Sequence, residues 1–187
     1  MASAYKKKIA LVIQNFFKNN NWRYEFNKDD GTIVFNLTMK NKAEGLWNVI
    51  DLQDNGYSVY ALFPLHANPD NHEQMKDISE FLNRANFGLI DGNFEFDFSS
   101  GVIRYKIHVS CQDSMPSPET VEYSLRRPQE VSHRYAPGII AVMLNGMPAA
   151  EAVSFCEVNA EEDKDWDEKP DKELLKYLYS SLDIQTE

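Results

Sequence analysis

FLNRANFGLIDGNFEFDFSSGVIRYKIHVSC, residues 81–111, decides the fold, because it joins the end of a helix to two strands and a tight turn. Strand side chains alternate between faces, so a turn with Ser100-Gly101 at its tip predicts an apolar face and a charged face. The predicted apolar pairs are Phe98 with Ile103, Phe96 with Tyr105 and Phe94 with Ile107; the polar pairs are Asp97 with Arg104, Glu95 with Lys106 and Asn93 with His108. Each opposite-charge pair is expected to contribute about 0.2–1 kcal/mol.

Two earlier segments predict further hairpins, with Asp30-Gly31 and Asn55-Gly56 as their turns. The predicted pairs are Phe26 with Phe35, Tyr24 with Leu37 and Trp22 with Met39 in the first, and Leu52 with Val59, Ile50 with Ala61 and Val49 with Leu62 in the second. The second hairpin is apolar on both faces, which is typical of central strands covered on two sides or bound by a partner.

Apolar residues spaced by three and four predict helices between and around these strands. The expected helices are residues 3–20; a helix opened by Pro69, capped by Asp70 and ended by Gly88 in the left-handed conformation; a region from Glu119 that Pro128 and Pro137 kink or divide; and residues 149–156. The order α-β-β-β-β-α-β-β-α predicts an α+β fold, an antiparallel sheet of mixed order with about six strands and helices mainly on one face.

Composition changes at Glu157, which predicts two parts. Residues 1–156 form the α+β domain, and residues 157–187 form an acidic linker followed by a short amphipathic helix. This helix carries Leu174, Leu175, Leu178 and Leu182 on one face. We expect it either to dock on the domain or to recognise another molecule.

The net charge and the number of cysteines restrict the expected binding partners and the expected cellular compartment. The chain of 187 residues has 19 Lys and Arg against 29 Asp and Glu, a net charge of -10, which disfavours binding to nucleic acid or to an anionic membrane. Cys111 and Cys156 form no short-range pair or ligand cluster, as expected in a reducing cytoplasm. No apolar run reaches the length of a membrane span, so a cytoplasmic protein is predicted.

Catalytic and ligand motifs are not found in the sequence. The four histidines have no metal-ligand spacing, and no phosphate loop or dinucleotide fingerprint occurs. Glu95 and Asp97 share a face and could form a catalytic acid pair. Their predicted cross-strand partners Lys106 and Arg104 favour a different interpretation, in which the two acids form ion pairs across the hairpin. The prediction is therefore a non-enzymatic protein with no catalytic residue, cofactor or metal.

Several motifs resemble the YbjN family of bacterial proteins. They are residues 81–86 (FLNRAN), 92–95 (GNFE), 101–105 (GVIRY), 135–138 (YAPG), Asn145-Gly146 and 149–152 (AAEA), within roughly residues 3–156. Members of that family are labelled sensory-transduction regulators, and their fold is similar to that of type III secretion chaperones, which dimerise and bind extended segments of other proteins. The resemblance implies a binding role and carries over no catalytic residue.

We therefore expect a chaperone-like or regulatory module that binds another protein, or itself as a homodimer, through the sheet face. The expected contact residues are Trp47, Val49 and Leu62 on the sheet and Leu174 and Leu178 in the C-terminal helix. The alternative is a small-ligand-binding domain or enzyme with a pocket between sheet and helices, lined by Arg84, Asn86 and His133.

Overall fold

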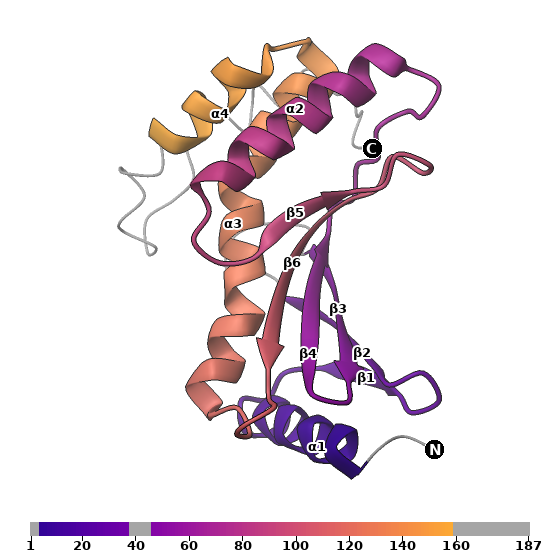
Figure 1. The fold of residues 1–187 in the computed structure, drawn as a ribbon, viewed down its shortest axis with the longest axis vertical. Helices are drawn as coiled ribbons and strands as arrows, with labels where there is room; N and C mark the ends of the chain where they lie inside the picture. The colour runs from indigo at the N-terminus through magenta and orange to yellow at the C-terminus, as the bar shows by residue number, and fades with distance from the viewer. Residues whose placement is uncertain (1–3, 38–45, 159–187) are drawn as a thin grey trace, which may run out of the picture.

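The computed structural model describes residues 4–37 and 46–158, which form four helices and one six-stranded sheet (Figure 1). The elements in chain order are α1 (Ala4–Asn19), β1 (Tyr24–Asn27), β2 (Thr32–Leu37), β3 (Leu46–Gln53), β4 (Gly56–Leu62), α2 (His72–Gly88), β5 (Asn93–Phe96), β6 (Ile103–Ser110), α3 (Pro118–Asn145) and α4 (Ala149–Val158). The predicted α+β class and element order are confirmed. Leu174 and Leu178 lie outside the described residues, and the division at residue 157 stays a prediction.

The sheet is antiparallel throughout, with strand order β1-β2-β3-β4-β6-β5. α3 runs along the sheet, α1 crosses its lower end in the view of Figure 1, and α2 and α4 lie together at the upper end. The core between the sheet and these helices holds fully buried side chains such as Ile50, Tyr57 and Tyr105. The face of the sheet that packs on the helices is called the inner face below, and the opposite face the outer face.

The predicted registers of all three hairpins are wrong by two residues. Phe94 pairs with Tyr105 instead of Ile107, and Ile50 pairs with Val59 instead of Ala61. In the first hairpin, Phe26 pairs with Ile33 instead of Phe35. A shift of two residues keeps every side chain on its predicted face, so the assignment of inner and outer faces survives the error.

The error comes from the position of glycine in the turns. Gly31 and Gly101 close four-residue loops in the left-handed conformation, with φ of 74° and 71°, instead of occupying the tip of a two-residue turn. Asn27 and Asp97 begin these loops, and their Oδ1 atoms accept the backbone N–H groups of Asp29 (3.0 Å) and Ser99 (2.9 Å). In the remaining hairpin Gly56 is already the first residue of β4, and Asp54-Asn55 makes the turn.

This loop geometry corrects two side-chain predictions. Phe98 lies in the loop and is 61% exposed, so it does not face Ile103 in the core. Asp97 accepts hydrogen bonds from the hydroxyls of Ser100 (2.5 Å) and Ser99 (2.7 Å) instead of pairing with Arg104. These hydrogen bonds lower the pKa of Asp97 from 3.8 to about 2.

Helix ends also differ from the prediction. Asn71, not Asp70, caps α2, because its side-chain oxygen accepts the backbone N–H of Gln74 (3.1 Å). Gly88 is the last residue of α2 and has no positive φ, so it is not a left-handed cap. α3 continues without a break through Pro128 and Pro137, and therefore forms one 28-residue helix.

Buried polar side chains attach α3 to the sheet. The hydroxyl of Tyr57 on β4 lies 2.9 Å from the Ser124 hydroxyl. Farther along, the Gln129 amide donates to Oδ1 of Asn48 on β3, whose own amide donates to the Leu46 carbonyl (2.6 Å). Because unpaired buried polar groups are costly, these bonds fix the position of α3 along the sheet.

Candidate protein-binding surface

The outer face of the sheet is not covered by α1, α2, α3 or α4 (Figure 1). Its side chains come from the alternate positions of the strands, which the burial pattern of β3 shows: Asn48, Ile50 and Leu52 are buried, while Trp47 is 63% exposed. The apolar surface residues Val34, Trp47, Val49, Tyr60 and Leu62 lie together on this face and are called the outer patch.

Cross-strand pairing makes the outer patch continuous over three central strands. Trp47 on β3 is directly opposite Leu62 on β4, and Val49 lies between Val34 on β2 and Tyr60 on β4. Opposite side chains in an antiparallel pair have Cβ atoms about 4.5–5.5 Å apart, so these side chains are neighbours. Trp47 is the most exposed of them and stands at one end of the patch.

Charged residues of β5 and β6 border the outer patch. Leu62 is opposite Arg104, and the Arg104 guanidinium carbon lies 4.2 Å from the centre of the Tyr60 ring, a cation–π distance. Glu95 forms ion pairs with Arg104 (2.6 Å) and with Lys106 (3.1 Å). Burial alone would raise the pKa of Glu95, but hydrogen bonds from Lys106 and Arg104 outweigh it and lower that pKa.

The structure thus brings together three of the five predicted contact residues, Trp47, Val49 and Leu62. The sequence prediction missed Tyr60 and Arg104, which connect the apolar half to the charged half. The alternation that identified Leu62 also places Tyr60 on the same face, two residues earlier in the strand. Arg104 was predicted on the charged face, but its neighbour Leu62 becomes visible only from the order of the strands.

The three residues predicted to line a ligand pocket do not line either of the two hollows in the described structure. The Asn86 side chain accepts the backbone N–H of Phe94 (2.7 Å) and donates to its carbonyl (3.1 Å), so it completes the outer edge of β5. Arg84 forms an exposed ion pair with Glu80 (2.8 Å) on the same helix. His133 is partly buried on α3, and neither of the two surface hollows described below is lined by any of the three.

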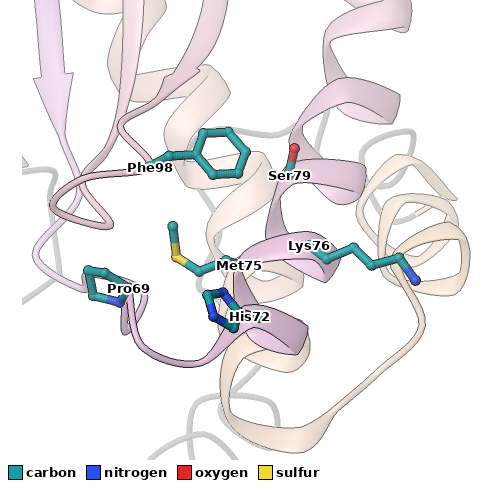
Figure 2. Close-up of a pocket in the computed structure, with 6 residues that line it drawn as sticks. All are labelled: Pro69, His72, Met75, Lys76, Ser79 and Phe98. Atoms are coloured by element: carbon teal, nitrogen blue, oxygen red, sulfur yellow. The ribbon is translucent and has the colours of Figure 1, made fainter.

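One hollow of about 500 Å³ lies between α2 and the loop of residues 98–101 (Figure 2). Met75 and Phe98 point into it from opposite sides, His72 and Pro69 form its lower wall in this view, and Lys76 points away. These side chains could hold a small apolar group. The second hollow, of about 510 Å³, lies at the edge of β6, between residues 91–93 and α3.

Both cysteines are buried thiols, and the acids of the described residues are not grouped as a metal site. Burial raises the pKa of Cys156 to about 12, and burial also raises the pKa of Cys111, so both thiols stay protonated at neutral pH. Among residues 4–37 and 46–158, no three His, Cys, Asp or Glu side chains are grouped as metal ligands would be. None of the helices in these ranges has the length and apolar character needed to cross a bilayer.

Comparison with solved structures shows a distant structural similarity. No family model matches the chain, and no curated protein matches it in sequence. The crystal structure of YbjN, a proposed transcription regulator from E. coli, is similar over 81% of this chain and 91% of that one, with a TM-score of 0.46 and 10% identity. At this level the similarity carries no functional argument, and membership of the YbjN family stays a prediction.

Proposed function

We propose that this protein is a non-enzymatic interaction module whose outer patch binds a protein surface, either that of another protein or that of a second copy. The observation that carries the proposal is the composition of the patch. Trp47, Tyr60 and Arg104 lie on one face of the sheet, and these three residue types dominate the binding energy of measured protein interfaces.

The arrangement of the patch supports a macromolecular partner rather than a small ligand. Small-molecule sites are concave and enclose most of the ligand. The outer patch instead extends across β2, β3 and β4, with a salt-bridged border of Glu95, Arg104 and Lys106. An apolar centre with a polar rim is the usual anatomy of a protein–protein interface.

Site-specific photo-crosslinking in cells that naturally make the protein tests this function. A benzophenone amino acid replaces Trp47 in one variant and Leu11 in the control; Leu11 is 57% exposed but lies on α1. We expect one discrete protein adduct from position 47 and none from position 11. An adduct of twice the chain mass identifies a homodimer, and any other mass identifies a different protein.

A second substitution in the crosslinking chain controls for chance proximity. Leu62→Asp places a charge next to Trp47 and should reduce the adduct yield by about tenfold or more. Leu144→Asp, at a 45% exposed position on α3, should leave the yield unchanged. If position 47 gives no adduct beyond that of position 11, the proposed function is wrong.

A further inference from the structure

The two halves of β6 differ in pairing. Residues Ile103–Lys106 lie between β4 and β5, but the register with β5 ends at the pair Asn93–Lys106. Beyond this pair, residues 107–110 remain paired with β4 on one side only. Figure 1 shows β6 extending past the start of β5 and alongside α3. This half of β6 is called the open edge.

The backbone groups that face the open edge can be identified from hydrogen bonds at the two ends of β6. The Phe63 N–H donates to the Ile103 carbonyl (3.0 Å), and the Cys111 N–H donates to the Asn55 carbonyl (2.8 Å), so the odd-numbered residues bond toward β4. Backbone groups alternate in an antiparallel ladder. The N–H and C=O groups of His108 and Ser110 therefore face away from β4, where β5 is absent.

No described residue takes the place of β5 at the open edge. The chain turns away at Gly92, which has a φ of 66°, and no backbone hydrogen bond to the N–H of His108 or Ser110 is formed by residues 4–37 or 46–158. The hollow of about 510 Å³ lies there instead, between Asp91 and Gly92 at one end and Thr120 and Tyr123 of α3 on the inner side. The hollow therefore lies beside the backbone N–H and C=O groups of His108 and Ser110, which have no strand partner among the described residues.

At the opposite edge of the β5–β6 hairpin, the free backbone groups of β5 are hydrogen-bonded by a side chain. The Asn86 side chain pairs with both backbone groups of Phe94, as a neighbouring strand would. Proteins commonly protect strand edges in such ways because an unpaired edge accepts another chain. The open edge has no corresponding side chain among the described residues.

We infer that the open edge of β6 is a binding site for an extended peptide segment, which adds a strand in line with β5 and bonds to His108 and Ser110. Strand addition of this kind gives affinity through the main chain and selectivity through alternate side chains. Inward side chains of the added segment would meet Ile107, Val109 and the Tyr123 ring, which favours apolar residues. Outward side chains would lie beside Lys106 and His108, which favours acidic residues. This site shares Lys106 with the border of the outer patch but does not depend on the function proposed for that patch.

Amide hydrogen exchange of the full chain, followed residue by residue by NMR, tests whether the edge is open. The amides of His108 and Ser110 should exchange much faster than those of Ile107 and Val109, which bond to β4. Equal protection of all four amides would show that the edge is already occupied and would overturn the inference.

Selection from a displayed library of random ten-residue peptides against the full chain tests binding. We expect enriched peptides of alternating apolar and acidic residues, whose affinity falls by about tenfold or more in His108→Pro, because proline removes the ladder N–H. The matched variant His108→Ala keeps this N–H and loses only the side chain, so it should lose less affinity than His108→Pro. Trp47→Ser, in the outer patch, should leave peptide binding unchanged.

A change on the peptide side avoids any effect of proline on folding. Methylating a backbone nitrogen of an enriched peptide that faces β6 should weaken binding by about tenfold, while methylating the adjacent nitrogen, which faces solvent, should not. Failure to enrich any peptide, or equal binding of both methylated forms, would refute the inference.

Discussion

The two faces of the sheet use the same strands for opposite purposes. On β3, Ile50 is fully buried on the inner face, while its neighbour Val49 lies partly exposed on the outer face. The inner face gains free energy from close packing against helices. The outer face keeps a tryptophan 63% exposed, so most of its surface is not buried by the described fold. The difference indicates that the inner face supplies most of the packing stability, whereas the outer face carries the residues on which the proposed function rests.

The comparison is tested most strongly by truncating adjacent residues of β3. Ile50→Ala should lower the free energy of unfolding by about 2–5 kcal/mol, because it leaves a cavity in the core. Val49→Ala, one residue away, should cost about 1 kcal/mol or less, since its side chain is only partly buried. Urea unfolding of both variants measures the difference, and equal losses would contradict the division between the faces.

A smaller effect is expected from the buried polar pair on the inner face. Gln129→Leu leaves Oδ1 of Asn48 without its donor and should cost about 1–3 kcal/mol. Adding Asn48→Leu removes the unpaired oxygen and should recover part of this loss, which makes the pair non-additive. A double-mutant cycle of unfolding free energies measures the coupling; strict additivity would show that the two side chains do not depend on each other.

The smallest effect concerns charge on the outer face. The pKa of Glu95 is lowered below its usual 4.5 in the folded chain, so its ion pairs stabilise the fold above that pH. This contribution is lost as the pH falls through the folded pKa. Glu95→Gln should therefore reduce stability at neutral pH and flatten the decline of stability below pH 4.5. Urea midpoints across this range measure it, and parallel declines in both proteins would contradict the assignment.

The sequence was sufficient for the class of the described helices and strands and for the face of each of these strands, because alternation is a local property. The sequence was insufficient for the register of the hairpins. Gly31 and Gly101, with φ of 74° and 71°, are the last residues of four-residue loops, whereas the prediction placed them at the tip of two-residue turns. The sequence pattern is the same in both cases, so only the backbone geometry of the loop distinguishes them. A competing cap one residue later, Asn71, displaced Asp70. Two prolines predicted a helix that is kinked or divided; α3 is not divided and stays one continuous helix.

The candidate site was predictable only in part for a related reason. Trp47, Val49 and Leu62 follow from alternation within one hairpin. Arg104 joins them through the pairing of β4 with β6, strands separated by the whole of α2. The open edge depends on the unequal lengths of β5 and β6, four and eight residues. Contacts between distant segments are set by the packing of the complete fold, which no short sequence pattern records.

The late position of α3 in the chain has a consequence for synthesis on the ribosome. All six strands precede residue 111, but the helix that runs along their inner face begins only at Pro118 and extends to Asn145. A nascent chain therefore carries a finished set of strands whose apolar side is covered by α1 and α2 alone until translation passes α3. During that interval the apolar inner face of the sheet, which α3 covers in the complete protein, is still exposed. Release of an incomplete chain at this stage therefore favours aggregation over folding.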